Sequence, residues 1–185
     1  VYIATPPGSH GEYARRVAAA GKPCLLEKPM ARNARECREI VAAFERAGQK
    51  VFVAYYRRSQ DRFKKFRALI PDLGRLRTVS YRHAQRPLPT IGPEGLPWRV
   101  EAEPAGGGLV MDVGCHALDM IDFLLGPMDA VTGSARNHGD RYAVEDFVEL
   151  AWRQEGGVTG TAEFDFQATA VADELTVIGD GGTLS

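Results

Sequence analysis

Hydrophobic and polar residues in the first third of the chain alternate between two patterns. Three short apolar runs have the length of buried parallel strands: 1–4, 23–27 and 51–55. Two segments with helical periodicity lie between these runs: 9–21 and 33–48. This β-α-β-α-β order with short connections predicts a parallel sheet with crossover helices.

Both predicted helices open with a pair of residues typical of a capping box. Glu12 follows Ser9 by three residues, and Glu36 follows Asn33 by three residues. In this motif the side chain before the helix accepts a hydrogen bond from a backbone N–H of the first turn. We therefore expect Ser9 and Asn33 to be the N-cap residues.

The pattern changes after residue 57. Two further amphipathic helices are predicted, over about 59–70 and 112–125. Strand-like alternation marks five segments: 76–83, 130–136, 145–152, 158–166 and 171–178. Strict alternation with short turns is typical of a largely antiparallel sheet with one covered face. A stretch rich in Pro and Gly, 84–107, is predicted to be a long loop. The fold class is thus α/β followed by α+β.

Composition limits the classes of function. The 185 residues are 44% hydrophobic and 25% charged with a net charge of −1, which is typical of a globular domain and disfavours nucleic-acid or membrane partners. No apolar run is long enough to span a membrane. The three cysteines show no metal-binding spacing, so we expect no metal site, free thiols and a reducing, cytoplasmic location. Because both ends interrupt strand-like patterns, the chain is expected to be a fragment of a longer protein.

The first candidate site is the run from Thr5 through Pro6 to His10. It follows a strand and precedes a helix, at the sheet edge where α/β proteins bind anionic ligands. A Pro-Pro turn with a capping Ser is the alternative.

A second candidate, Glu27-Lys28-Pro29, follows the next strand and is expected at the same edge. A lysine held there could stabilise negative charge on a substrate oxygen. The alternative is a surface lysine before a helix-initiating proline.

The third candidate lies in the run G-G-G-L-V-M-D-V-G-C-H-A-L-D, from position 106 to 119. Asp112, His116 and Asp119 have i, i+4, i+7 spacing and are expected on one helical face. A His with an Asp one turn away suits acid–base catalysis. Gly114 costs a helix about 1 kcal/mol relative to Ala, which suggests a close approach of ligand or backbone. A capping Asp with a buried, hydrogen-bonded His is the alternative.

Together, T-P-P-G-S-H, E-K-P, W-R and the 106–119 motif resemble the Gfo/Idh/MocA oxidoreductases, named for glucose–fructose oxidoreductase and inositol 2-dehydrogenase. The resemblance runs through essentially the whole chain. It implies the C-terminal part of a Rossmann domain at 1–57 and an open, mostly antiparallel sheet domain at 58–185, which is truncated. It also implies a cis Lys28–Pro29 peptide. The family's Gly-rich fingerprint is absent from this sequence, so NAD and NADP are equally open.

The resemblance assigns roles to the matching positions. It implies three catalytic residues: Lys28, Asp112 and His116. It implies a cofactor site for NAD or NADP at seven positions: Thr5, Pro6, His10, Glu27, Lys28, Trp98 and Arg99.

The implied activity is hydride transfer between nicotinamide and a secondary alcohol of a sugar or cyclitol, in a homo-oligomer formed through the C-terminal sheet. Two alternatives stay open. One is an NAD-dependent glycosidase of the same family, and the other is a non-enzymatic regulator that binds dinucleotide or sugar.

Overall fold

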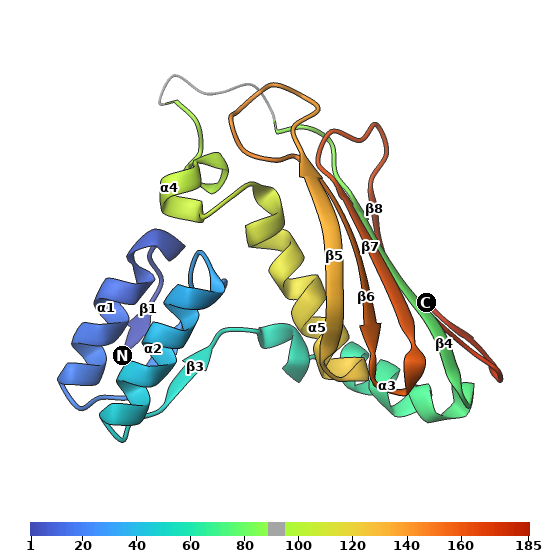
Figure 1. Ribbon diagram of the computed structural model, residues 1–185, viewed down its shortest axis with the longest axis horizontal. Helices are drawn as coiled ribbons and strands as arrows, with labels where there is room; N and C mark the ends of the chain where they lie inside the picture. Colours follow the sequence, from blue (N-terminus) through green and yellow to red (C-terminus); the bar gives the residue numbers. More distant parts are fainter. Residues whose placement is uncertain (89–94) are drawn as a thin grey trace. The chain divides into compact units, whose positions relative to one another are not determined.

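The computed structural model describes residues 1–88 and 95–185 (Figure 1). Its backbone divides into two compact units. The first consists of Val1–Tyr55, a later segment that ends at Cys115, and the short piece Tyr142–Val144. The second begins at Tyr56 and contains most of the remaining chain. The domain limits 1–57 and 58–185 stay a prediction.

The first unit contains the predicted parallel sheet. Its three strands lie in the order β1-β2-β3, with every neighbouring pair parallel. The strands are β1 (Tyr2–Ile3), β2 (Cys24–Leu26) and β3 (Val51–Val53). The crossover helices are α1 (Pro7–Ala19) and α2 (Ala34–Arg46). The β-α-β-α-β prediction is therefore confirmed.

One of the two capping predictions is confirmed and the other is wrong. Asn33 is the N-cap of α2, and its side chain accepts a hydrogen bond from the backbone N–H three residues on. Helix α1 instead begins at Pro7, with Pro6 as the N-cap and no side-chain cap. Proline favours the first helical position because its φ is already helical and it has no N–H to leave unpaired. The helix therefore begins two residues before Ser9.

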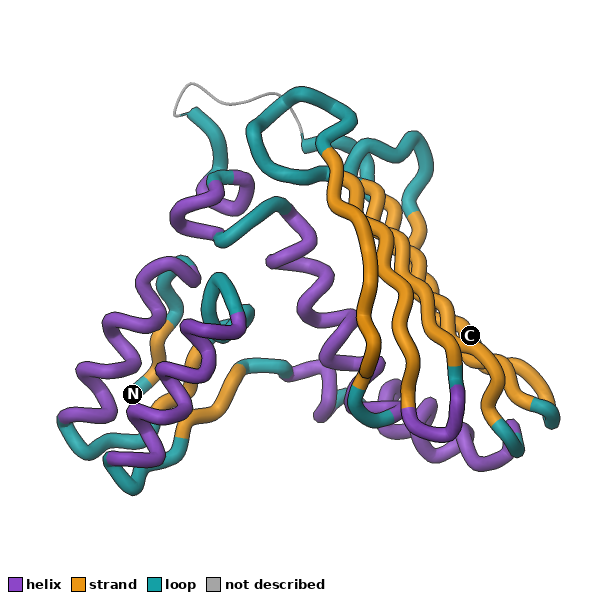
Figure 2. Tube along the Cα trace, in the orientation of Figure 1, coloured by secondary structure: helices purple, strands orange, loops and turns teal. Residues whose placement is uncertain are grey.

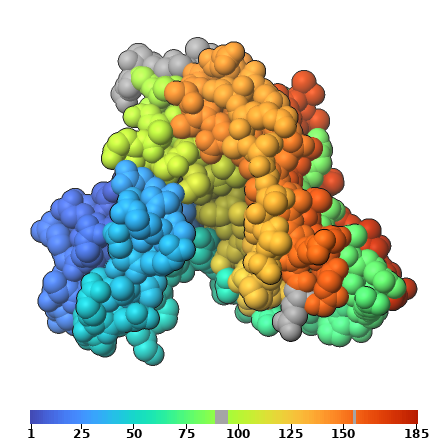
Figure 3. Space-filling view, in the orientation of Figure 1, coloured from blue at the N-terminus to red at the C-terminus, as the bar shows by residue number. Residues whose placement is uncertain are grey.

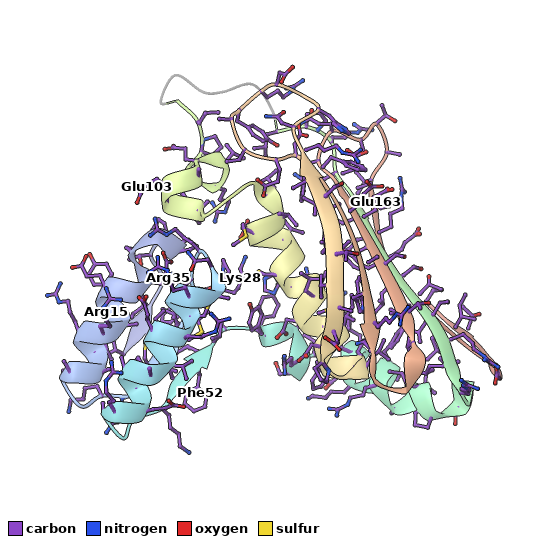
Figure 4. All side chains as sticks on the ribbon, viewed as in Figure 1. Arg15, Lys28, Arg35, Phe52, Glu103 and Glu163 are labelled. Atoms are coloured by element: carbon purple, nitrogen blue, oxygen red, sulfur yellow. The ribbon has the colours of Figure 1, made fainter. Side chains whose placement is uncertain are left out.

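The core of this unit lies between the two helices and one face of the sheet. Small and branched apolar side chains fill it: Ile3, Ala14, Ala18, Cys24, Leu26, Ala31, Ile40 and Phe44. On the opposite face, Tyr2, Leu25 and Phe52 are paired across the three strands and are 57%, 43% and 56% exposed. Figure 4 shows Phe52 on β3.

The second unit is built on a six-stranded sheet in the order β5-β6-β7-β4-β8-β9 (Figure 2). Its strands are β4 (Leu76–Ala84), β5 (Met128–Arg136), β6 (Phe147–Gln154), β7 (Thr159–Asp165), β8 (Ala172–Gly179) and β9 (Gly182–Leu184). Neighbouring strands are antiparallel except for β4 and β7, which are parallel. The same unit contains helices α3 (Asp61–Leu69) and α5 (Cys115–Leu125). The largely antiparallel sheet is thus confirmed.

Alternation along the strands separates a covered face from an open face. On β7, Gly160, Ala162 and Phe164 are buried while Thr161 is exposed. Side chains on the open face are mostly Thr, Ser, Glu and Arg, and Arg82 and Glu163 form an ion pair there at 3.0 Å. Figure 4 labels Glu163. The edge strand β5 is exposed along most of its length (Figure 3).

Two predicted elements differ from the structure. The described part of 84–107 is not a structureless loop, because it contains a 3₁₀ turn at Trp98–Val100 and helix α4 (Ala102–Ala105). Residues 89–94 of that prediction lie outside the described part of the chain. The helix expected from 112 begins earlier, as a π-helical turn at Val110–Gly114 that leads directly into α5. Gly114 is buried inside that turn.

Candidate active site

Lys28 lies directly after β2, and its position is fixed by a residue 84 positions later in the chain. Its ammonium donates to Asp112 Oδ1 at 2.5 Å and to the Asp112 backbone oxygen at 3.0 Å. The two side chains are only 17% and 25% exposed. The Lys28–Pro29 peptide is cis, as predicted. Figure 4 marks Lys28 in the first unit.

A second cation binds the same carboxylate. The Arg99 Nε donates to Asp112 Oδ2 at 3.1 Å, and the Arg99 guanidinium lies 4.4 Å from the centre of the Trp98 ring. Each oxygen of Asp112 therefore accepts from a different cation. The predicted residues Lys28, Asp112, Trp98 and Arg99 are thus brought together in the first unit.

Arg32 links the segment that carries Trp98, Arg99 and Asp112 to the rest of the first unit. Its guanidinium donates to the backbone oxygen and to the carboxylate of Glu103, each at 3.0 Å. Gly106 has a φ of +89°, and a Cβ there would lie 2.7 Å from the Arg32 Cβ. Arg32 also binds Glu36, and this hydrogen bond holds the pKa of Glu36 below its ordinary value. The glycine at 106 permits this close approach.

The carboxyl ends of β1 and β2 carry the remaining first-unit residues. Glu27 accepts hydrogen bonds from the Tyr2 hydroxyl and, at 3.1 Å, from the Lys28 backbone N–H. The hydrogen bond to Glu27 raises the pKa of Tyr2. The Thr5 hydroxyl oxygen accepts from Ser9 at 2.8 Å. Thr5, Pro6, Glu27 and Lys28 therefore follow neighbouring strands at one sheet edge, as expected.

His10 is fully buried in α1. Its Nε2 is 2.7 Å from the backbone oxygen of Thr5, and its Nδ1 is 3.1 Å from that of Pro29 and 3.2 Å from that of Met30. The ring therefore links the segments that follow β1 and β2 through contacts with their backbone oxygens.

His116 belongs to the second unit and lies in the first turn of α5. It is 6% exposed, and its ring meets the edge of Tyr56 with centroids 5.3 Å apart. Asp119 accepts from Arg58, with a shortest distance of 2.5 Å. The three residues predicted on one helical face thus have separate polar or aromatic partners: Asp112 binds Lys28 and Arg99, His116 contacts Tyr56, and Asp119 binds Arg58.

Two contributors to these sites, Tyr56 and Arg58, escaped the sequence analysis, and so did one contact of Arg99. Arg99 was expected to contact the cofactor, and its bond to Asp112 was not foreseen. Tyr56 and Arg58, which contact His116 and Asp119, lie in a short 3₁₀ turn without a motif. The opposite charges of Arg58 and Asp119 were the only sequence signal for their contact. That signal does not single out Arg58, because the chain contains many other arginines.

The described residues give no sign of a metal centre or a membrane span. No group of three or more His, Cys, Asp or Glu side chains within 1–88 and 95–185 could hold a metal ion. Cys24, Cys37 and Cys115 form no disulfide, and burial raises the pKa of the Cys24 and Cys37 thiols. Over the same residues, no helix is both long and apolar enough to cross a membrane.

Comparison with known proteins identifies the family. Residues 1–55 match the family model described as an oxidoreductase family with an NAD-binding Rossmann fold, and residues 63–185 match the GFO/IDH/MocA C-terminal domain. The chain therefore belongs to the Gfo/Idh/MocA oxidoreductase family, as its motifs predicted.

Curated relatives match over the whole chain. An oxidoreductase from Formosa agariphila is 31% identical over 100% of this chain and 58% of its own length. A 1,5-anhydro-D-fructose reductase from Ensifer adhaerens is 30% identical over 100% of this chain and 55% of its own length. The chain thus spans little more than half the length of these relatives.

Solved structures share the fold. An aldose-aldose oxidoreductase from Caulobacter crescentus, complexed with glycerol, has a TM-score of 0.87 and 30% identity over 99% of this chain and 54% of its own. The WlbA dehydrogenase from Bordetella pertussis, in complex with NADH and UDP-GlcNAcA, has a TM-score of 0.87 and 27% identity over 97% of this chain and 52% of its own. The Rossmann-type start and the mixed-sheet second part are therefore shared with complete dehydrogenases.

Proposed function

We propose that the intact protein is an NAD(P)-dependent oxidoreductase that transfers hydride between nicotinamide and a secondary alcohol of a sugar or cyclitol. The observation that carries this proposal is the contact of Lys28 with Asp112 at 2.5 Å. These residues are distant in sequence, and each stands in a motif assigned to catalysis by the family resemblance. Arg99 on the second carboxylate oxygen completes a charged group of three.

Each residue has a defined part in the proposed reaction. Lys28 would stabilise negative charge on the substrate oxygen as the hydride departs. His116 would take the hydroxyl proton, since an imidazole can accept and release a proton near neutral pH. Asp112 would fix the Lys28 ammonium, and it precedes His116 by four residues along a continuous helical segment.

The residues at the sheet edge fit a dinucleotide. The carboxyl ends of the strands meet the start of α1 at this edge, where the positive end of the helix dipole favours anionic groups. Six residues would hold the cofactor directly: Thr5, Pro6, Glu27, Lys28, Trp98 and Arg99. His10 would contribute at the same edge. NAD or NADP, when bound, supplies the nicotinamide that exchanges hydride with the substrate carbon.

The relatives support a polyol or sugar as the substrate. Among them are a reductase of 1,5-anhydro-D-fructose and an aldose-aldose oxidoreductase whose structure holds glycerol. A polyol presents adjacent hydroxyl groups, and the Lys28 ammonium can donate a hydrogen bond to one of them.

Activity assays on the intact protein test this proposal. A panel of sugars and cyclitols with NAD or NADP should give reduced nicotinamide, measured by its absorbance. Lys28→Met should lower kcat about a hundredfold or more, whereas Lys64→Met, on the exposed surface of α3, should leave kcat unchanged.

Other outcomes would contradict the proposal. Release of sugar from an aryl glycoside without net reduced nicotinamide would indicate the glycosidase alternative. Binding of dinucleotide without turnover on any substrate would indicate a regulator.

Three further features belong to the same proposal. A homo-oligomer would form through the open face of the six-stranded sheet, where Thr and Ser side chains are flanked by charges of both signs. A cytoplasmic location is supported by cysteines that form no disulfide. A division near residue 57 would separate the dinucleotide-binding part from the substrate-binding part.

A further inference from the structure

His10 has an unusual set of hydrogen-bond partners. The three oxygens in contact with its ring, those of Thr5, Pro29 and Met30, are all backbone carbonyls. Carbonyl oxygens only accept hydrogen bonds, so each ring nitrogen in contact with one must donate. A neutral imidazole has one N–H and would place its other nitrogen's lone pair against an oxygen. With 0% exposure, the ring is shielded from the bulk solvent that would relieve that repulsion.

These contacts join two segments that both belong to the candidate site. Thr5 follows β1, whereas Pro29 and Met30 follow β2 and come immediately after Lys28. Since β1 and β2 are parallel neighbours, their carboxyl ends lie at one edge of the sheet. The ring thus fixes the backbone at Pro29 and Met30, immediately after the residue that carries the Lys28 ammonium.

We propose that His10 is a positioning residue that donates from both ring nitrogens, ties the end of β1 to Pro29 and Met30, and thereby holds Lys28 against Asp112. This inference rests on the catalytic role of Lys28 in the proposed function. It makes the contribution of His10 to the cofactor edge an indirect one, through the backbone of Thr5 and Pro29.

The protonation of the ring is measured by ¹⁵N NMR of the intact protein. The His10 signals are assigned by their loss in the spectrum of His10→Gln. Both His10 nitrogens are expected to show attached protons. A neutral tautomer, with one unprotonated nitrogen, would overturn the two-sided link. This measurement does not depend on any enzymatic activity.

Two substitutions test the consequence for Lys28. His10→Asn keeps a donor near the Nδ1 position, and His10→Gln keeps one near the Nε2 position. Each retains only half of the link, so kcat should fall about tenfold or more in both, as expected when a catalytic group is displaced. The affinity for NAD(P) should fall by a smaller factor than kcat, because the proposed cofactor residues Glu27, Trp98 and Arg99 are not hydrogen-bonded to the ring. The opposite split, with weaker cofactor binding at unchanged kcat, would overturn the proposal.

A stability-matched control separates positioning from general loosening of the core. Ile40→Val removes one methyl group from the buried core of the first unit, away from the strand ends. It should leave kcat unchanged, and an equal fall in kcat would overturn the positioning role. In crystals of His10→Gln, Lys28 Nζ should move away from Asp112 Oδ1, whereas an unchanged pair would contradict the inference. If the intact protein reduces no nicotinamide, the proposed function fails, while the NMR and crystallographic results still decide the role of His10.

Discussion

At the scale of single residues, the charge balance around Asp112 is the most informative feature. One carboxylate meets two cations, so the group of Lys28, Arg99 and Asp112 keeps a net positive charge. In a partly buried setting, such a charge acts more strongly on a nearby anion than it would in water. An oxygen that becomes negative as its hydride departs is the kind of anion this arrangement favours.

His116→Ala tests the division of labour between substrate and cofactor residues. Removal of the proposed proton acceptor should lower kcat about a hundredfold or more. Affinity for NAD(P) should stay nearly unchanged, because His116 is proposed to act on the substrate hydroxyl. Steady-state kinetics and nicotinamide fluorescence titrations on the intact protein measure the two quantities. A large loss of cofactor affinity with normal turnover would contradict the assignment.

Glu36 gives a prediction about stability and pH. Its bond to Arg32 lowers its pKa in the folded protein, below the ordinary value of 4.5. The stabilisation is therefore fully present above pH 4.5, the ordinary value, and is lost as the pH falls through the lower folded value. Glu36→Gln should lower the free energy of unfolding by about 1–2 kcal/mol at pH 7.

The pH dependence of that difference is the sharper test. Denaturant titrations should show the gap between the original protein and Glu36→Gln closing as the pH drops well below 4.5. Glu45→Gln, on the exposed end of the same helix, should show a much smaller gap at pH 7. A gap for Glu36→Gln that stays constant with pH would show that the ion pair is not its source.

At the scale of elements, glycines determine how closely neighbours approach. In the sheet, Gly160 on β7 lies opposite Trp152 on β6, and the indole occupies the space that a Cβ at 160 would need. Trp152 is 3% exposed, so the indole has little room to move. Without a side chain at 160, a tryptophan fits on the covered face between two paired strands.

Gly160→Ala should therefore destabilise the second unit by about 1–3 kcal/mol, the usual effect of overpacking a core. Thermal or denaturant unfolding measures the loss, and Thr161→Ala on the exposed side of the same strand is the control. Combining Gly160→Ala with Trp152→Leu should cost less than the sum of the two single changes, because the smaller side chain leaves room for the methyl group. Strict additivity would show that the indole is not the obstacle.

At the scale of the whole molecule, the open sheet face is the surface proposed for self-association. Thr161 lies on a central strand of that face and is exposed. Its neighbours carry both signs of charge, including Arg82 and Glu163. Since a two-fold axis places the same patch on both partners, small polar side chains and mixed charges can meet without repulsion.

Thr161→Arg should convert the proposed oligomer of the intact protein to monomers, because a long charged side chain would prevent two faces from approaching. Analytical ultracentrifugation measures the mass. Glu12→Gln changes the net charge by the same amount on an exposed position of α1 and should leave the oligomer intact. A protein that is monomeric without substitution, or an oligomer that survives Thr161→Arg, would contradict this interface.

Local signals in the sequence determined the elements and the family. The apolar runs before Thr5 and Lys28 predicted parallel strands, because short apolar runs are typical of strands in a parallel sheet. Asn33 predicted a cap, because its hydrogen bond spans only three residues. The motif around Asp112 and His116 identified the family.

Tertiary structure decided what depends on contacts between distant segments. Helix α1 begins at Pro7 and not at Ser9. A π-helical turn precedes α5. Arg99 donates a hydrogen bond to the second carboxylate oxygen of Asp112. No local pattern could assign the Asp112 carboxylate to Lys28 and Arg99, because a partner of opposite charge is specified only when the fold brings it within reach.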